Sequence, residues 1–185
     1  MRHRALLSYL RSEGLPTSGS HVLHVAPEPA LQQWFRSLDT IQYTSMDLDS
    51  PLAEVHADIT ALPFSEETFD LVLCSHVLEH VPDDRAAMRE LRRVVRPGGR
   101  VIVQVPPSDL PETFEDPSVT SPAERERLFG QYDHVRICGA DYGQRLEESG
   151  FDVESVDYVA RLDPPTRQRH GLWTGEPFYV CMRSA

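Results

Sequence analysis

The sequence predicts an α/β fold, in which a seven-stranded, mostly parallel sheet with an antiparallel last strand carries helices on both faces. Three observations favour this fold. Segments typical of strands and of helices alternate along the chain. Residues 69–75 are almost wholly apolar, as expected of a strand that is buried on both faces. Two strand-like stretches, 151–159 and 177–182, are joined by a linker rich in turn residues, which can return the chain antiparallel.

The first part of the sheet is expected to contain five strands, at residues 21–26, 41–46, 54–57, 69–75 and 100–105. Right-handed crossovers place the first of these strands near the middle of the sheet. In such sheets, ligands bind at the carboxyl ends of the central strands, where the strand order reverses. We therefore expect the functional residues just after the points where these strands end.

Three helices are expected between the strands. The spacing of apolar residues predicts one helix over residues 29–38. Either Asp83 or Asp84 can cap a second helix, which runs to about residue 96 and is ended by the sequence RPGG. Asp141 is expected to cap a third helix over residues 142–149, which Gly150 closes.

Length and charge limit the class of protein. The 185 residues suffice for a single domain over 1–185, with an N-terminal helix and linker at 1–20. Residues 106–135 form either a lid over the site or a long surface connection. The net charge of -11 argues against a general nucleic-acid partner. Because neither a signal peptide nor a membrane span is recognisable, a cytoplasmic location without a membrane partner is expected.

Acidic side chains follow the second and third predicted strands, at the expected ligand-binding edge. Asp47 and Asp49 come after the second strand, where a carboxylate can accept hydrogen bonds from both hydroxyls of a ribose. The alternative is an acidic turn. Asp58 follows the third strand and could accept a hydrogen bond from an adenine amine, or cap a turn. Taken alone, these residues leave both interpretations open.

A longer series of motifs resembles a known family. Residues 57–106, ADITALPFSEETFDLVLCSHVLEHVPDDRAAMRELRRVVRPGGRVIVQVP, resemble the class I S-adenosylmethionine-dependent methyltransferases, and within them the small type 11 group. Residues 129–151 are similar to the family's closing region. The resemblance implies a Rossmann-like sheet, S-adenosylmethionine as cofactor, and methyl transfer to an acceptor. No Asn-Pro-Pro-Tyr-type motif follows the fourth strand, which favours a small-molecule acceptor over an adenine or glutamine amine.

The resemblance also implies roles for single residues. Five positions match the family's cofactor-binding residues, namely Asp47 at the ribose, Asp58 and Ile59 at the adenine edge, and Ser75 and His76 at the methionine end. Leu48, next to Asp47, is also expected to bind the cofactor. Ser75 and His76 would in addition face the substrate.

The loop after the first strand departs from the family pattern. The family usually has a Gly-x-Gly there, whereas residues 21–31, HVLHVAPEPAL, contain no glycine. His24 stands where an acidic residue is common, and Ala26, Pro27 and Glu28 form the turn. Glu28 could pair with the ammonium of the cofactor. Alternatively, the loop has lost cofactor binding, and the chain is a non-catalytic binding or regulatory module. A nicotinamide-dependent enzyme is disfavoured because GxGxxG is missing.

Three histidines are candidate general bases, because an imidazole titrates near neutral pH. They are His76, His80 and His134, of which His134 could instead be a loop residue bonded to backbone. Residues 76–80 also fit H-x-x-E-H, a zinc peptidase pattern. That pattern needs a continuous helix and a third ligand, whereas here it begins at the end of a strand and Pro82 follows at once. We therefore expect no metal.

Overall fold

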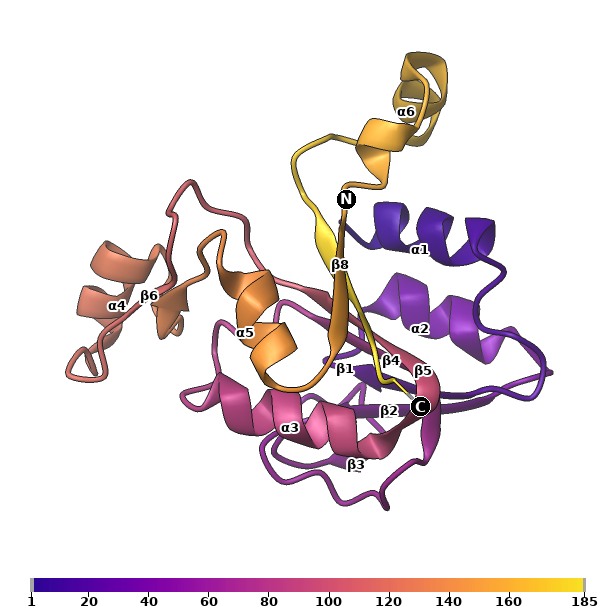
Figure 1. Ribbon diagram of the computed structural model, residues 1–185, viewed down its shortest axis with the longest axis horizontal. Coiled ribbons are helices and arrows are strands. Elements are labelled where there is room, and N and C mark those ends of the chain that lie inside the picture. Colours follow the sequence, from indigo (N-terminus) through magenta and orange to yellow (C-terminus); the bar gives the residue numbers. More distant parts are fainter. Residues whose placement is uncertain (1, 185) are drawn as a thin grey trace.

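A mixed seven-stranded sheet forms the centre of the computed structural model, which describes residues 2–184 (Figure 1). The strand order is β3-β2-β1-β4-β5-β9-β8. Neighbouring strands from β3 to β5 are parallel, and β9 is antiparallel to both β5 and β8. The strands are β1 His21–Val25, β2 Gln42–Asp47, β3 Val55–His56, β4 Phe69–Ser75, β5 Val95–Gln104, β8 Asp152–Val156 and β9 Phe178–Met182. The predicted α/β fold with an antiparallel last strand is confirmed.

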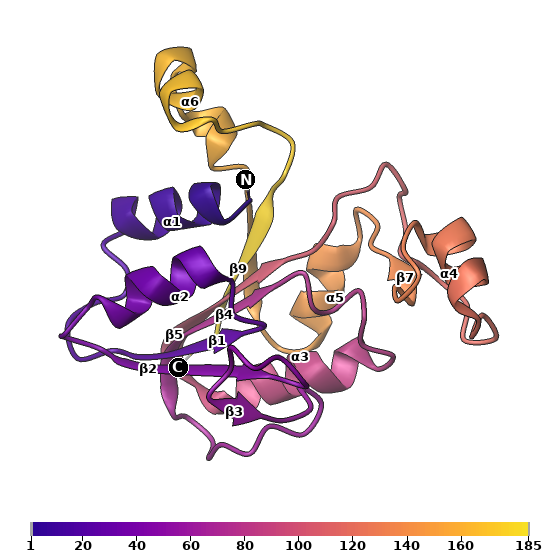
Figure 2. The same cartoon turned by 180° about the vertical axis from the view of Figure 1, so that it is seen from behind.

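Helices cover both faces of this sheet, as Figures 1 and 2 show from opposite sides. The helices α1 (Arg2–Ser12) and α2 (Pro29–Arg36) pack on one face, and α3 (Asp84–Val94) and α5 (Tyr142–Glu148) pack on the other. The buried residues accordingly fall into two apolar clusters, one on each side of the sheet. Alternation of strand side chains explains this division, because successive residues of β1 point to opposite faces.

The register of the central strands brings their carboxyl ends to one edge. Val25, at the end of β1, pairs with Met46 of β2 on one side and with Cys74 of β4 on the other. The residues that follow these three positions therefore emerge side by side. The sequence order changes direction between β1 and β4, which is where ligands bind in sheets of this kind.

Local sequence signals account for the helix that follows β4. The carboxylate of Asp83 accepts a hydrogen bond from the Ala86 N–H and so caps α3. The cap of α5 differs from the prediction, because the Asp141 side chain makes no capping hydrogen bond. Its carboxylate accepts hydrogen bonds from the N–H and hydroxyl of Thr113 instead. Asp141 thus connects the start of α5 to the segment that contains Thr113.

The start of β5 also differs from the prediction. The RPGG sequence ends α3 but lies inside β5, which begins at Val95 rather than at residue 100. Val95 pairs with Phe69, and the next pair joins Arg100 to Leu71, so the intervening residues bulge out of the ladder. Gly98 makes the bulge possible by adopting a φ of 77°, in the left-handed region.

The later part of the chain contains two short strands and two helices that the sequence analysis did not assign. Strand β6 (Phe114–Glu115) pairs with β7 (Arg136–Ile137), and α4 (Pro122–Phe129) lies between them in sequence. These elements project to one side of the main sheet (Figure 1). The linker between β8 and β9 contains α6 (Pro164–His170). Asp163 caps α6 by accepting from the Thr166 N–H, and Gly171 ends it at a φ of 61°.

None of the helices in residues 2–184 is long and apolar enough to cross a membrane. The three cysteines, Cys74, Cys138 and Cys181, are buried and unpaired.

Candidate active site

The larger of two cavities at the carboxyl edge of the sheet lies beside the ends of β1, β2 and β4. It has a volume of about 800 Å³. Among the residues that the sequence assigned to a cofactor, six line this cavity, namely Ala26, Asp47, Leu48, Asp58, Ile59 and His76. The structure thus brings together residues that are as far apart in sequence as Ala26 and His76. Its walls combine apolar side chains with an almost equal number of polar ones, among them four aspartates, one arginine and two histidines.

Asp47 is held in a fixed orientation at the end of β2. Its Oδ1 atom accepts hydrogen bonds from the N–H groups of Asp49 (2.9 Å) and Ser50 (2.8 Å). Its Oδ2 atom has no hydrogen-bond partner among the residues that the structure describes. A carboxylate that is oriented by backbone donors and keeps one oxygen open suits recognition of a ribose diol.

The loop after β3 offers an acceptor, a donor and an apolar surface. Asp58 accepts hydrogen bonds through Oδ1 from the N–H (2.8 Å) and hydroxyl (2.7 Å) of Thr60, which lower the pKa of Asp58. Within residues 2–184, the Ile59 N–H donates no backbone hydrogen bond. Leu48 is 62% exposed and presents an apolar side chain beside this loop. An adenine ring could be bonded at its polar edge and covered on one face by Leu48.

The loop after β1 keeps a glycine-like conformation without glycine. Ala26 has a φ of 50°, which is uncommon for a residue other than glycine, asparagine or aspartate. Its N–H donates to the Met46 carbonyl at 2.8 Å, which holds the turn against β2. Pro27 and Glu28 follow but do not line the larger cavity. The Oε2 atom of Glu28 is buried and has no partner among the described residues.

Two other predicted cofactor residues do not reach the larger cavity. His24 is fully buried against Phe35 and Tyr43, and its Nδ1 lies 3.0 Å from the Tyr43 hydroxyl. Burial lowers the pKa of His24 to about 4, so the imidazole is neutral at pH 7. Ser75 is buried at the end of β4 and donates to the Gln104 Oε1 at 3.3 Å. The alternation of strand side chains sends His24 into the apolar core under α2.

The smaller cavity, of about 460 Å³, adjoins the larger one. His76 and His80 line both cavities. All three histidines that the sequence named as candidate bases line the smaller cavity, because His134 also lies there. The remaining lining residues are Glu79, Gln104, Pro106, Pro107, Gln131 and Glu176. They come from four separate segments, and only Glu79, within the H-x-x-E-H pattern, belongs to a motif that the sequence analysis singled out.

The polar groups of the smaller cavity contact one another. The His76 Nδ1 lies 3.1 Å from the Glu79 Oε1, and the His80 Nδ1 lies 3.3 Å from the Asp133 Oδ2. The rings of His80 and His134 meet edge to face, with centroids 4.7 Å apart. Burial and the neighbouring His80 imidazole lower the pKa of His134, so His134 is neutral at pH 7. His76 has a φ of 54°, which places a second strained residue at the edge of the sheet.

Arg136 fixes the loop that carries Glu79 and His80. Its guanidinium is 1% exposed and donates hydrogen bonds to the carbonyls of Leu78, Val81 and Pro82. Its Nε donates to the Glu115 carboxylate at 3.0 Å. A planar fork with five donors can bind several acceptors at once, as here. Arg136 lies two residues after His134. The segment that contributes His134 to the smaller cavity therefore also contributes the arginine that holds the loop after β4.

The fold is the Rossmann-like fold of methyltransferase domains, and comparison with known proteins places the chain in a family. A family model described as a methyltransferase domain matches residues 12–103, about half of the chain. A curated relative, the 27-O-demethylrifamycin SV methyltransferase of Amycolatopsis mediterranei, is 29% identical over 120 residues, which cover 65% of this chain and 43% of that protein. The chain belongs to the class I S-adenosylmethionine-dependent methyltransferase family. It spans less than half the length of this relative.

Solved structures show the same fold. A putative methyltransferase from Bacillus halodurans superimposes with a TM-score of 0.64 at 17% identity, and 97% of this chain and 99% of that one are covered. A protein described as the [4+2]-cyclase SpnF superimposes with a TM-score of 0.66 at 17% identity, and 98% of this chain and 82% of that one are covered. Because the second protein is described as a cyclase, the fold alone does not define the reaction.

Proposed function

We propose that this chain binds S-adenosylmethionine in the larger cavity and transfers its methyl group to a small molecule in the smaller cavity. The observation that carries the proposal is the adjacency of the two cavities, which share His76 and His80. The bound cofactor would supply an activated methyl group on sulfur. The protein would supply alignment, exclusion of water and a base for an acceptor that carries a proton.

The residues present fit the cofactor. Asp47 would hold the ribose through its open Oδ2, and Asp58 and the Ile59 N–H would bind the adenine edge. The turn from Ala26 to Glu28 would approach the amino-acid end, where Glu28 has a buried oxygen in need of a partner. These roles follow from hydrogen-bonding capacity and from position at the strand ends.

His76 is the best-placed base for the acceptor. Its Nδ1 faces the Glu79 carboxylate, so the proton belongs on Nδ1 and the lone pair on Nε2. A carboxylate that fixes the tautomer of an imidazole in this way is a recurrent arrangement for a general base. The Nε2 atom is buried and has no partner among the described residues, so an acceptor would have to come into direct contact with it. His80 and His134 would then shape the cavity around the acceptor rather than take its proton.

The size and charge of the molecule favour a small acceptor in the cytoplasm. A cavity of about 460 Å³ suits a compact organic molecule. The net charge of -11 disfavours a nucleic-acid acceptor. Three buried, unpaired cysteines are in keeping with a reducing compartment. Residues 106–135 would act as a lid, because Arg125, Gln131 and His134 of that segment line one or the other cavity.

Calorimetric titration with S-adenosylhomocysteine tests the cofactor site. We expect wild-type protein to bind, and Asp47→Ala to weaken binding by about 10-fold to 100-fold, because hydrogen bonds to a charged group contribute about 1.5–3 kcal/mol. Asp49→Ala is the matched control, because Asp49 does not line the cavity and donates to Asp47 only through its backbone. Absence of binding by the wild type at millimolar ligand would overturn the proposal.

A second candidate function is a non-catalytic binding or regulatory module on the same fold. The glycine-free loop favours it, since Pro27 offers no N–H and neither Pro27 nor Glu28 lines the larger cavity. The same titration separates the two functions. Loss of cofactor binding in the wild type would favour the module, whereas binding that depends on Asp47 would favour the enzyme.

A further inference from the structure

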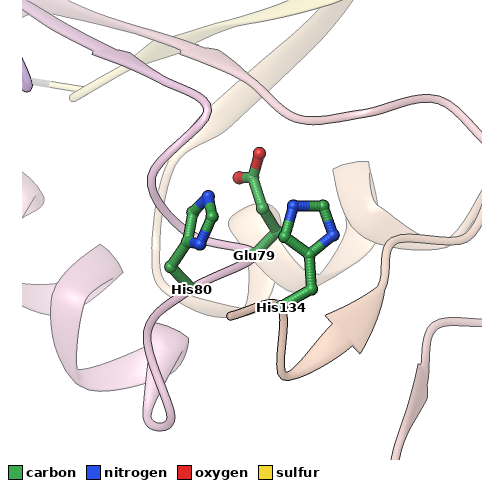
Figure 3. A group of neighbouring side chains, drawn as sticks. All are labelled: Glu79, His80 and His134. Atoms are coloured by element: carbon green, nitrogen blue, oxygen red, sulfur yellow. The ribbon is translucent and has the colours of Figure 1, made fainter. Parts of the chain in front are cut away.

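Three metal-ligating side chains converge in the smaller cavity. Glu79, His80 and His134 each offer one ligand atom, and these atoms all lie within 4.8 Å of one another (Figure 3). Glu79 and His80 come from the loop after β4, and His134 comes from the segment before β7. Two imidazoles and a carboxylate form a donor set that divalent transition metals bind in many proteins.

One oxygen of the Glu79 carboxylate is buried without a hydrogen-bond partner within residues 2–184. Glu79 is 1% exposed, and its Oε2 atom has no hydrogen-bond partner among the described residues. Leaving a charged oxygen buried and unpaired is unfavourable, because the lost hydration is not replaced. The two nearest side chains of the cluster, His80 and His134, do not donate a hydrogen bond to this oxygen. A cation at the centre of the cluster would satisfy this oxygen.

Each of the three side chains is oriented by a neighbour through its other polar atom. The Glu79 Oε1 faces the His76 Nδ1 at 3.1 Å, and the His80 Nδ1 faces the Asp133 carboxylate at 3.3 Å. The His134 Nδ1 lies 3.3 Å from the Phe129 carbonyl. Contacts of Nδ1 with a carboxylate or carbonyl leave Nε2 of both histidines as a lone-pair donor. Carboxylates and backbone carbonyls are common outer partners of metal-ligating residues in known sites.

The two segments that carry the ligands are joined directly. The Val135 N–H donates to the Glu79 carbonyl at 2.9 Å, which sets His134 beside Glu79. Arg136 binds three carbonyls of the loop that carries Glu79 and His80. The ligands are therefore held in place by buried contacts before any ion arrives, which lowers the cost of ordering the site.

We propose that Glu79, His80 and His134 form a binding site for a divalent transition metal, with Zn²⁺ as the expected ion. Three atoms no more than 4.8 Å apart have a common point within about 2.8 Å of each. Zinc bonds to nitrogen and oxygen are about 2.0–2.2 Å long, so each side chain would move inward by less than about 1 Å. The site revises the sequence expectation of no metal, and it differs from the H-x-x-E-H pattern, because Glu79 and His134 join His80 as ligands and His76 is not one of them.

The position of the site indicates a class of acceptor, a step that rests on the proposed function. Three protein ligands leave at least one position of the metal open, as in catalytic zinc sites. That position would face the smaller cavity, next to the His76 that adjoins the cofactor cavity. An acceptor that carries a hydroxyl group could bind there, and the charge of the metal would lower the pKa of that hydroxyl.

Metal binding can be measured without any methyl transfer. Tag-free protein is stripped with a chelator, dialysed and titrated with ZnCl₂ by calorimetry, and with CoCl₂ by visible absorption. We expect one ion per chain. Glu79→Gln and His134→Gln should each weaken binding by more than about tenfold, and Asp133→Asn, which alters only an outer partner, by about tenfold. Glu126→Gln and His170→Gln are matched controls on exposed positions of α4 and α6 and should bind as the wild type does.

Two results would overturn the site. One is wild-type protein that takes up no metal, and the other is equal binding by the wild type, Glu79→Gln and His134→Gln. If Glu79→Gln does not fold, as judged by circular dichroism, His134→Gln and Asp133→Asn carry the test, because both positions are partly exposed. Titration of the same samples with S-adenosylhomocysteine separates this inference from the proposed function. Asp47→Ala should show weakened binding of S-adenosylhomocysteine and unchanged binding of the metal. His134→Gln should show weakened binding of the metal and unchanged binding of S-adenosylhomocysteine.

Discussion

The larger and the smaller cavity share two histidines but are built in different ways. In the larger cavity, the polar groups follow directly on the ends of parallel strands, and Asp47 and Asp58 are oriented by N–H groups within three residues of them. In the smaller cavity, the polar groups come from distant segments, and buried Arg136 holds the two segments together. The difference teaches that strand order and short turns position the polar groups of the larger cavity, whereas those of the smaller cavity depend on long-range contacts, above all those of Arg136.

Removing Arg136 is expected to have the largest effect. Arg136→Met would leave three carbonyls of the loop after β4 without this donor, and would remove a cation that lies 3.6 Å from Asp84 and 3.0 Å from Glu115. Both carboxylates keep Arg145, at 2.9 Å and 3.3 Å, so most of the loss comes from the buried carbonyls. Each unsatisfied buried acceptor costs about 1–3 kcal/mol, and we expect the free energy of unfolding to fall by about 3–5 kcal/mol in total. Urea denaturation measures this loss. Arg127→Met, on the exposed face of α4, is the control and should change the free energy by less than about 0.5 kcal/mol.

A small loss in Arg136→Met, of under about 1 kcal/mol, would break the comparison. The loop after β4 would then be held by its own contacts, as the larger cavity is. The acceptor side would no longer depend on the segment that contains His134.

The part of the sheet beneath the larger cavity contains a buried titratable group, which gives the second prediction. His24 has a pKa of about 4 in the folded protein and about 6.5 when unfolded. Below pH 6.5 the unfolded chain binds a proton that the folded chain does not, so stability falls as the pH is lowered. The loss is complete near pH 4 and amounts to about 3 kcal/mol. His24→Leu removes this contribution.

The measurement is the difference in unfolding free energy between the wild type and His24→Leu at several pH values from 7 to 4. Carboxylates titrate equally in both proteins, so the difference reports His24. A difference that does not change with pH would show that the imidazole is protonated in the folded protein. The core of that part of the sheet would then contain a cation, with Tyr43 as its nearest partner.

The sequence predicted the features that depend on local pattern. The alternation of apolar and polar runs gave the seven main strands, and the rule on strand ends gave Asp47, Asp58 and Ile59 as neighbours. His24 was misplaced because the family comparison matches positions, whereas the direction of a side chain depends on strand alternation. The cap of α6, Asp163 with two prolines after it, was present in the sequence but was interpreted as a turn.

The smaller cavity could not be predicted in the same way. The contact of His134 with Glu79 and His80 depends on β6 pairing with β7 and on Arg136 entering the loop after β4. Neither contact has a local signature, because a two-residue strand carries no periodicity and a buried arginine resembles an exposed one in sequence. The proximity of His134 to Glu79 and His80 was therefore visible only in three dimensions.

The smallest expected effect tests whether the loop after β1 is a strained copy of a glycine loop. Ala26 has a φ of 50°, where an L-residue is less stable than glycine by about 1 kcal/mol. Ala26→Gly should therefore raise the unfolding free energy by up to about 1 kcal/mol, although glycine is more flexible in the unfolded chain. The same exchange in the interior of α3, Ala87→Gly, should lower it by at least about 1 kcal/mol.

Changes in unfolding free energy of opposite sign in the two variants would show that the turn keeps its shape because the strands on either side impose it. If both exchanges destabilise the protein, Ala26 is relaxed, and the loss of glycine has given the loop a new shape. Titration of Ala26→Gly with S-adenosylhomocysteine then decides what that shape does, because a gain in affinity would mark the alanine as an obstacle to the cofactor.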